Sequence, residues 1–359
     1  NEQLWAPGLR SMQAVMALAH LGLGIQFEAV KRHMTGPRPR VVAGALAFGA
    51  RCAAERFGIE AATIQLSPVA FLSAQEPPTL PGLWMPPWLP MWARELEYRI
   101  ADHVSDRLLM GPTRDFRDRH GLPQIRGMAR HWFNSPNLTI AMFPGWYAPP
   151  AEDWPASVEM ADFPLWDERG EADIPAEATD FLASCPPPGP IIFTPGSAMV
   201  HGRQFFKAAV DLCVKLDAPG ILLTRHPHQL PQSLPSQLRH FDYLPFSWLL
   251  PQASCLIHHG GIGTVSQALR AGTPQLIAAM AYDQPDNGKR ITQIGAGLTT
   301  TFDTFCSGRA VAKVRQLHTD DAIRTVCKAL AIRLDGERTG IKWACDLLTR
   351  TAWGSSARL

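Results

Sequence analysis

The strongest constraint on the fold is the stretch Cys255-Leu-Ile-His-His-Gly-Gly-Ile-Gly-Thr264, which runs on into a helical pattern. A short apolar run is followed by two histidines and then by three glycines within four positions. This order predicts a strand that feeds a helix through a turn with almost no side chains. Backbone N–H groups of such a turn reach a phosphate at the positive end of the helix, because glycine has no Cβ atom to block the approach. The stretch therefore predicts a site for a nucleotide or another phosphorylated ligand.

The pattern on either side of this turn is that of an α/β protein. Over 190–301, short apolar runs alternate with amphipathic segments, as in a doubly wound parallel sheet. An earlier β-α-β unit is predicted over 40–67. We predict a first domain over 1–182, a linker over the proline-rich residues 183–190, a second domain over 191–340 and a C-terminal helix over 341–359 that packs back on the first domain.

Composition excludes several classes of protein. A chain of 359 residues is long enough for two well-buried cores. Its formal net charge of +2, without a dense run of Lys and Arg, argues against a nucleic-acid partner. The seven cysteines are scattered and form no C-x-x-C pair, which predicts reduced thiols in a cytoplasmic protein and no zinc site. No uninterrupted run of about 18 apolar residues is present, so we do not expect a membrane-spanning helix.

Three other phosphate-binding patterns fit the glycine turn poorly. Gly261-Ile-Gly263 matches the start of the dinucleotide fingerprint G-x-G-x-x-G, and Asp283 lies about 20 residues on, where that fingerprint has an acid. The third position is Ser266, however, and the motif comes late in its domain. No Gly-Lys-Ser/Thr ends the turn, which excludes a P-loop, and no Asp-x-Asp triplet is present to hold a divalent ion. We therefore expect a diphosphate to be held by the helix N-terminus, the turn amides and His259, without a metal.

The run His-His-Gly-Gly-Ile-Gly-Thr-Val-Ser-Gln-Ala-Leu-Arg-Ala-Gly-Thr-Pro-Gln over 258–275, followed by Asp283-Gln284, resembles the donor signature of the UDP-glycosyltransferase-like family. The resemblance implies inverting, metal-independent enzymes with two facing Rossmann-like domains, the GT-B type. It implies no cofactor, and a UDP- or dTDP-sugar as substrate. Within the family, Ser67-Pro68, Phe143-Pro144 and the Ala-Pro-Pro of 148–150 are most similar to the rhamnosyltransferase subunits of bacterial rhamnolipid synthesis.

The same resemblance implies roles for individual residues. Those expected around the donor diphosphate are Ser197, His259, Gly261, Gly263 and Thr264. Those expected around the nucleoside are Tyr243, which would stack on the base, Leu244, whose backbone would read the base edge, and Gln267. Gln267 stands where relatives often carry a ribose-binding Glu, and an amide holds a hydroxyl less tightly than a carboxylate does, so both UDP and dTDP stay open. Those expected at the transferred sugar are Asp283 and Gln284.

The acceptor region is predicted only from composition. Residues 77–92 are rich in proline and tryptophan, so they cannot form a regular helix or a central strand. Trp84, Trp88 and Trp92 are expected to form the lip of a site for a hydrophobic acceptor. Packing of this loop on its own domain, and a peripheral contact with the inner face of a membrane, are the alternatives.

The catalytic base is expected upstream of residue 1. Members of the family begin with a strand and a glycine-rich loop that carries the base, whereas this chain opens with a helical pattern and reaches its first clear strand at Val41. We therefore expect a first domain that is incomplete at its N-terminus. His20, His33 and Asp102 have no motif that would support them as replacements.

Together these features predict a cytoplasmic enzyme, with membrane association left open. It would transfer a hexose or deoxyhexose, such as glucose or rhamnose, from a nucleotide sugar to a hydroxyl of a lipid-like or other hydrophobic acceptor. Two alternatives stay open: a nucleotide-sugar epimerase on the same fold, and a non-catalytic module that binds a nucleotide sugar.

Overall fold

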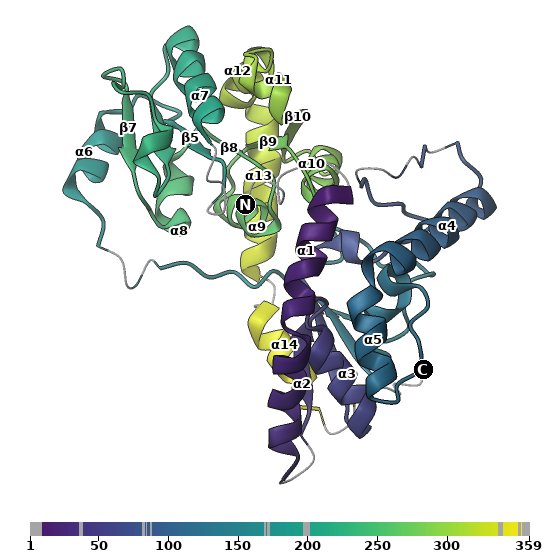
Figure 1. The fold of residues 1–359 in the computed structure, drawn as a ribbon. Helices are drawn as coiled ribbons and strands as arrows, with labels where there is room; N and C mark the ends of the chain where they lie inside the picture. The colour runs from purple at the N-terminus through teal and green to yellow at the C-terminus, as the bar shows by residue number, and fades with distance from the viewer. Residues whose placement is uncertain are drawn as a thin grey trace. The chain divides into compact units, whose positions relative to one another are not determined.

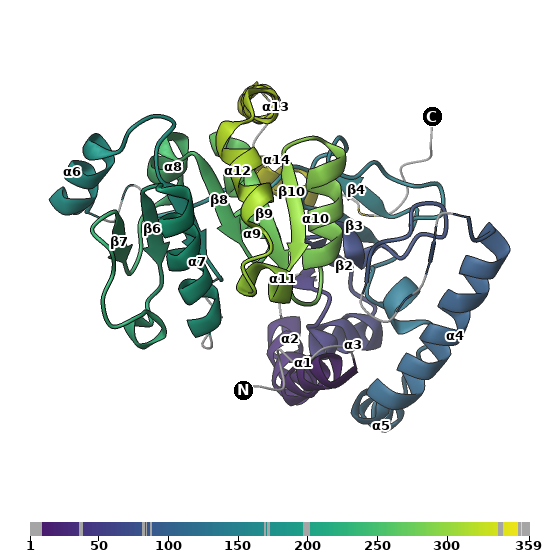
Figure 2. The same cartoon turned by 90° about the horizontal axis from the view of Figure 1, so that it is seen from above.

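The chain forms two compact units, residues 1–164 with 339–359 and residues 165–338. The computed structural model describes residues 9–35, 39–80, 83, 85, 86, 88–168, 170, 173–196, 202–336, 340–350 and 353. Each unit is built on a parallel sheet with helices packed against it (Figures 1 and 2). The predicted α/β class is confirmed.

The sheet of the first unit has the strand order β1-β2-β3-β4, with every neighbouring pair parallel. Its strands are β1 (Val41–Gly44), β2 (Ala61–Gln65), β3 (Leu138–Ala141) and β4 (Val158–Met160). One face of the sheet buries Ile140 beneath Leu347 of the C-terminal helix α14 (Gly340–Leu348). Arg40, just before β1, lies 4.6 Å from the centroid of the Trp353 ring. The end of the chain is therefore part of the first unit.

Helices α1 (Leu9–Leu21), α2 (Leu23–Arg32), α3 (Phe48–Phe57) and α5 (Gly111–Arg119) share one core of the first unit. A Cβ atom on Gly49 would lie 2.0 Å from the carbonyl oxygen of Leu23, so only glycine permits this approach of α3 to α2. By length and composition alone, residues 12–32 could cross a membrane, but a core helix passes the same test. Leu23 and Phe27 of this segment are buried in the core, whereas Leu18, Leu21 and Ile25 are exposed.

Local structure in this region differs from the sequence prediction at two points. The opening helical pattern is not one helix, because the structure breaks it at Gly22, which is the N-cap of α2. The first strand of the β-α-β unit predicted over 40–67 is short, since β1 ends at Gly44 and Phe48 opens α3. The buried Phe48 packs in the helical core against α2 and does not extend the sheet.

Two further segments complete the first unit. The long helix α4 (Met91–Leu109) is followed by α5, and a single π-helical turn, η4 (Met128–Trp132), precedes β3. Asp106 of α4 accepts hydrogen bonds from the backbone N–H groups of Gly127 and Met128 at 2.8 and 3.0 Å, which attaches η4 to this helix.

The sheet of the second unit has the order β10-β9-β8-β5-β6-β7 and is parallel throughout. Its strands are β5 (Ile191–Thr194), β6 (Gly220–Leu223), β7 (Leu238–Phe241), β8 (Cys255–His258), β9 (Gln275–Ala279) and β10 (Gly297–Thr301). From β5 the chain adds β6 and β7 on one side of β5, and then returns to add β8 on the other side of β5. The strand order therefore reverses between β5 and β8. In open sheets of this kind, ligands bind at the carboxyl ends of the strands where the order reverses.

Helices cover both faces of this sheet (Figure 2). They are α6 (Ala176–Ser184), α7 (Arg203–Leu216), α8 (Phe246–Leu249), α9 (Ile262–Ala271), α10 (Gln284–Gln293), α11 (Phe302–Cys306), α12 (Val311–Thr319) and α13 (Asp321–Gly336). Phe205 and Phe206 of α7 are buried against β5 and β8 in a core that also includes Phe305.

The boundary between the units falls between Pro164 and Leu165, ahead of the predicted linker over 183–190. The acidic and proline-rich stretch contains α6, whose Ala178 and Phe181 pack in one core with Ile221 of β6. Proline content predicted an exposed linker between the domains. The Ala178 and Phe181 side chains instead pack this segment against the sheet of the second unit.

Candidate functional site

The first histidine of the motif shapes the turn from the inside. His258 ends β8 with no exposed surface, and its Nδ1 accepts a hydrogen bond from the N–H of Gly260 at 3.1 Å. Its Nε2 therefore carries the hydrogen, which it donates to Oε1 of Gln275 at 3.0 Å. Burial lowers the pKa of His258 to about 3, so the ring is neutral at pH 7. His258 thus orients the turn and is not exposed to a ligand.

The second histidine lies where the strand order reverses. Thr194 and His258 are paired at the ends of β5 and β8, so the next residue, His259, extends over the first turn of the unit. A Cβ atom on Gly196 would lie 2.6 Å from Cε1 of His259, and one on Gly261 would lie 2.5 Å from Nε2. The imidazole therefore packs directly on the backbone at both glycines, and Gly196 also has a φ of +97°, which favours glycine.

Burial lowers the pKa of His259 to about 4, so this ring too is neutral at pH 7. Its Nδ1 is buried and has no hydrogen-bond partner among the described residues. A neutral imidazole has one N–H to donate and one nitrogen to accept. His259 is therefore suited to donate a hydrogen bond to a ligand oxygen at the end of the strand, without bringing a positive charge.

Helix α9 begins directly after the glycines. Its N-cap is Gly261, which has no side chain to cap the helix, so the N–H groups of Ile262 and Gly263 are available to an anion. Gly263 is exposed in this turn, and the N–H of Thr264 bonds the carbonyl of Gly261 at 3.0 Å. The structure thus brings His259, Gly261, Gly263 and Thr264 together at one helix end, while Ser197 lies outside the described residues.

The start of α10 is joined to the same turn. Asn287 donates hydrogen bonds from Nδ2 to the carbonyl of Gly260 at 2.9 Å and to Oδ2 of Asp283 at 2.8 Å. Gln284 is almost fully buried, and its Oε1 accepts from the N–H groups of Met280 and Ala281 at 2.8 and 3.1 Å. Asp283 is therefore held beside the glycine turn, whereas the amide oxygen of Gln284 is occupied by backbone.

Two of the predicted nucleoside residues, Tyr243 and Leu244, follow the end of β7. The Tyr243 ring has the guanidinium carbon of Arg225 at 5.5 Å from its centroid, and its hydroxyl accepts from the N–H of Glu168 at 3.2 Å. Burial is the largest cause of a raised pKa at Tyr243. Leu244 is buried in the core beneath it. Tyr243 is thus a partly exposed aromatic ring with a cation on one side.

Gln267 is tied to the opening segment of the second unit. Its Nε2 donates to the carbonyl of Trp166 at 2.9 Å, and the Trp166 side chain is 64% exposed. Asp167 accepts from the N–H of Ser247 at 2.7 Å. The segment 166–168 therefore links the regions of Tyr243 and Gln267.

Sequence reasoning missed three parts of this arrangement: Asn287, Arg225 and the segment 166–168. Asn287 lies four residues after Asp283, a spacing that puts both on one helix face. Arg225 and the segment 166–168 carry no motif, and no sequence signal indicates that they meet Tyr243.

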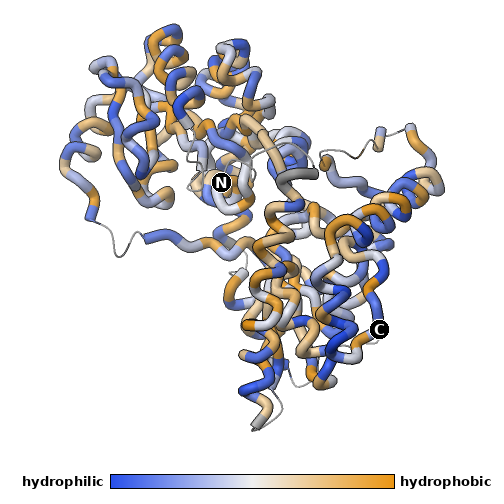
Figure 3. Tube along the Cα trace, viewed as in Figure 1, coloured by the Kyte–Doolittle hydropathy of each residue, from blue (hydrophilic) through white to orange (hydrophobic). Residues whose placement is uncertain are grey.

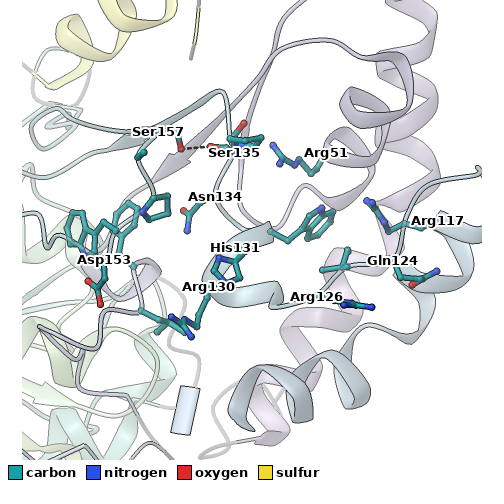
Figure 4. Close-up of a pocket in the computed structure, with 18 residues that line it drawn as sticks. Arg51, Arg117, Gln124, Arg126, Arg130, His131, Asn134, Ser135, Asp153 and Ser157 are labelled. Atoms are coloured by element: carbon teal, nitrogen blue, oxygen red, sulfur yellow. Dashed lines mark hydrogen bonds between the residues drawn. The ribbon is translucent and has the colours of Figure 1, made fainter. Parts of the chain in front are cut away.

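The first unit contains a cavity of about 630 Å³ whose lining combines aromatic side chains with four arginines, Arg51, Arg117, Arg126 and Arg130 (Figure 4). Phe71 and Trp154 stack at a centroid distance of 4.3 Å, and Trp132 lines another part. Asn134 lies among the lining residues with Oδ1 bonded to Nε2 of Gln65 at 2.9 Å. Of the tryptophans expected near an acceptor, Trp88 and Trp92 do not line this cavity, and Trp84 lies outside the described residues.

Within the described ranges, no group of three or more His, Cys, Asp and Glu side chains is arranged to hold a metal ion. The site is built instead from backbone N–H groups, amides, hydroxyls and one available imidazole.

Comparison with known proteins finds relatives and structural neighbours named as sugar transferases. Residues 207–337 match the family model "Erythromycin biosynthesis protein CIII-like, C-terminal domain". The chain is 27% identical over 271 residues to O-mycaminosyltylonolide 6-deoxyallosyltransferase of Streptomyces fradiae, an alignment that covers 75% of this chain and 62% of that relative. The chain therefore spans less than two thirds of that relative's length.

Solved glycosyltransferases share the fold. The glycotransferase of kitacinnamycin superposes with a TM-score of 0.72 at 20% identity, over 97% of this chain and 85% of that one. Spinosyn rhamnosyltransferase, solved in complexes with thymidine diphosphate and with the spinosyn aglycone, superposes with a TM-score of 0.61 at 16% identity, again over 97% and 85%. These structures show that the fold of this chain is that of the GT-B glycosyltransferases.

Proposed function

We propose that this protein transfers a hexose or deoxyhexose from a UDP- or dTDP-sugar to a hydroxyl of a hydrophobic acceptor, with inversion. The observation that carries the proposal is the neutral His259, which lies at the N-terminus of α9 with the glycine turn on one side and Gly196 on the other. Relatives and structural neighbours with glycosyltransferase names support the reaction class.

In the proposed reaction, the acceptor hydroxyl attacks the anomeric carbon and the nucleoside diphosphate leaves. Negative charge grows on the leaving oxygen as the glycosidic bond breaks. Donors that are already in place at that point stabilise this charge, because they need no reorganisation during the reaction. The N–H of His259 and the first-turn amides of α9 would supply these donors, and Ser197 and the Thr264 hydroxyl would add to them.

We further propose that Tyr243 stacks on the base, that the Leu244 backbone reads its edge and that Gln267 faces the ribose. Arg225, whose guanidinium lies near the Tyr243 ring, would place a positive charge beside the bound nucleoside. The glycine turn itself carries no charged side chain. Asp283 would accept hydrogen bonds from hydroxyls of the transferred sugar. Gln284 has only its Nε2 group left for the sugar, since its oxygen binds the backbone.

The acceptor is proposed to be a lipid-like or other hydrophobic molecule, and the first unit its binding domain. Two features support this: the Phe71, Trp132 and Trp154 side chains in the lining of the cavity, and the exposed Trp88 and Trp92. Similarity to rhamnolipid rhamnosyltransferases in the first half of the sequence favours an acceptor with an alkyl chain. A peripheral membrane contact would bring the enzyme to such an acceptor.

Thermal unfolding with a panel of UDP, dTDP, UDP-glucose and dTDP-rhamnose tests the donor site. A ligand that binds only the folded state raises Tm, and we expect at least one nucleotide sugar to do so. His259→Ala should lose this shift, whereas His33→Ala, at an exposed position in the first unit, should keep it. Unchanged nucleotide binding in His259→Ala would overturn the assignment.

Product analysis tests the reaction class. With donor and a hydroxylated alkyl acceptor, we expect a glycosylated acceptor and free nucleoside diphosphate. An altered sugar formed from the donor alone would indicate an epimerase instead.

A further inference from the structure

One face of helix α4 carries a row of exposed apolar side chains. These residues recur every four positions and are 45–71% exposed: Trp92, Leu96, Ile100, Val104 and Leu108. Trp88 and Met91, at the start of the helix, are 69% and 54% exposed. Orange segments recur along α4 in the hydropathy-coloured trace (Figure 3). We call this row, together with the exposed polar residues between its members, the outward face of α4.

The opposite face of α4 is what attaches the helix to its unit. Tyr98 is 1% exposed and donates from its hydroxyl to the carbonyl of Ser73 at 3.2 Å, and Arg94 donates to the carbonyl of Ala74 at 3.0 Å. Leu109 is buried in the core shared by α2 and α3. The helix is thus ordered without any contribution from the outward face.

Three of the four acidic residues of α4 contact other parts of the first unit. Glu95 forms an ion pair with Arg130 at 3.0 Å. Asp106 binds backbone N–H groups of η4, and Asp102 lies close to Gly127 of the same segment. Glu97 is also only partly exposed.

The exposed charged and titratable residues of α4 are all basic: Arg99, His103 and Arg107. Arg107 and His103 lie one helical turn apart, with Nη1 and Nε2 separated by 3.4 Å. The outward face therefore combines an apolar row with basic groups and carries no exposed acid.

We propose that the outward face of α4 docks the protein on an anionic membrane surface. A helix of 19 residues is roughly 28 Å long, and one with an apolar row and basic flanks lies in the plane of the interface. The apolar side chains enter the boundary between headgroups and acyl chains, and the basic groups meet anionic headgroups. Trp88 and Trp92 fit this position, because indole rings are favoured at the membrane–water interface.

A second copy of the chain fits the same face poorly. A two-fold interface brings identical patches together, so Arg99, His103 and Arg107 would face their own counterparts. No exposed acid on the helix is available to balance them. Anionic lipids supply the charge that a symmetric dimer lacks.

This inference does not depend on the transfer reaction, because vesicle binding requires neither donor nor acceptor. If the protein docks as proposed, it would encounter a lipid-like acceptor in the membrane in which that acceptor is dissolved. The two proposals can therefore fail separately.

Flotation of the full chain with vesicles tests the docking surface. We would compare pure phosphatidylcholine with a mixture containing roughly one quarter phosphatidylglycerol, at low and at physiological salt. We expect binding to the anionic vesicles that weakens as salt is raised, since the basic residues act through screened charges. Binding to pure phosphatidylcholine should be much weaker.

Two sets of substitutions separate the apolar and basic contributions. Leu96→Gln with Ile100→Gln and Leu108→Gln removes apolar contacts, and Arg99→Gln with Arg107→Gln removes charge. Because these side chains are exposed, folding measured by circular dichroism should be unchanged, while each set should weaken binding roughly tenfold or more. The matched control is Val214→Gln with Ile332→Gln, at positions 55% and 73% exposed on α7 and α13, which should bind as the wild type does.

Three results would overturn the proposal. The first is equal binding to neutral and anionic vesicles. The second is equal loss of binding in the α4 variants and in the control. The third is a dimer, seen by analytical ultracentrifugation without lipid, that the α4 substitutions dissociate, because the face would then be an interface between copies of the chain.

Discussion

Asn287 donates a hydrogen bond to Asp283 one helical turn before it, at 2.8 Å, and the same amide group bonds the carbonyl of Gly260. One buried side chain thus joins the proposed sugar-binding carboxylate to the glycine turn.

Asn287→Ala should weaken donor binding without removing any residue proposed to touch the donor. Loss of the amide frees the Asp283 carboxylate and leaves the Gly260 carbonyl without this bond, which costs about 1–3 kcal/mol for a buried group. We expect the donor KM to rise roughly tenfold, with a smaller change in kcat. Steady-state kinetics with donor as the varied substrate provide the measurement. Asn287→Asp, which keeps the shape but loses the donor group, should behave like Asn287→Ala, and wild-type kinetics in both variants would contradict the positioning role.

Substitutions at Tyr243 should separate the ring from its hydroxyl. Base–aromatic stacking contributes about 1–3 kcal/mol, so Tyr243→Ala should weaken nucleotide binding roughly tenfold or more. Tyr243→Phe keeps the ring and loses only the bond from the N–H of Glu168, so its effect should be a few-fold. Calorimetric titration with UDP and dTDP checks this order. Equal losses in the two variants would show that the hydroxyl, and not the stacked ring, is what matters.

Donor binding should be coupled to proton uptake at His259. The pKa of this ring is about 4 in the free protein, and a diphosphate beside it favours the protonated form and raises the pKa. Affinity should therefore be highest at low pH and fall as pH rises through the pKa of the complex. Calorimetry with a nucleotide sugar in two buffers of different ionisation enthalpy measures the uptake. His259→Gln, which keeps an N–H donor but does not titrate, should abolish it, and uptake that persists in this variant would assign it elsewhere.

His258 should make the fold sensitive to acid. Its pKa is about 3 when folded and 6.5 when unfolded, so below pH 6.5 the unfolded chain binds a proton that the folded chain does not. The contribution of His258 to the free energy of unfolding is fully present above pH 6.5. It falls by about 1.4 kcal/mol per pH unit as the pH drops toward 3. Urea unfolding at pH 7, 6 and 5 measures the slope. His258→Gln should be less stable than the wild type at pH 7, because the hydrogen bonds to Gly260 and Gln275 change. Its free energy of unfolding should fall less between pH 7 and pH 5 than that of the wild type. An equal fall in the two proteins would contradict the assignment to His258.

Gly196→Ala should impair both folding and donor binding. The residue has a φ of +97°, and its Cβ would lie 2.6 Å from the imidazole of His259, so the ring must move. We expect a lower Tm and loss of the nucleotide-dependent shift. Gly24→Ala is the matched control, because a Cβ there meets nothing within 4 Å and the site lies inside α2. The same change in both variants would argue against a specific contact at Gly196.

The sequence by itself determined the strand, turn and helix around His259, and with them the α/β class and the expectation of a phosphate at the α9 N-terminus. These features are local, because glycine spacing and apolar periodicity act over a few residues. The two histidines show where sequence-based prediction stops, because both precede the glycines in the same motif. Only the pairing of β5 with β8 places the His258 side chain against Gln275 and the His259 side chain against Gly196.

The tertiary structure decided which distant segments meet. The contact of Asn287 with Gly260, the approach of Arg225 to Tyr243 and the bond from Gln267 to Trp166 all join different segments of the second unit. The unit boundary and the outward face of α4 were also decided there, because burial depends on what packs against a side chain. Phe181 in an acidic stretch is buried, and Leu96 in an amphipathic helix is exposed, for that reason.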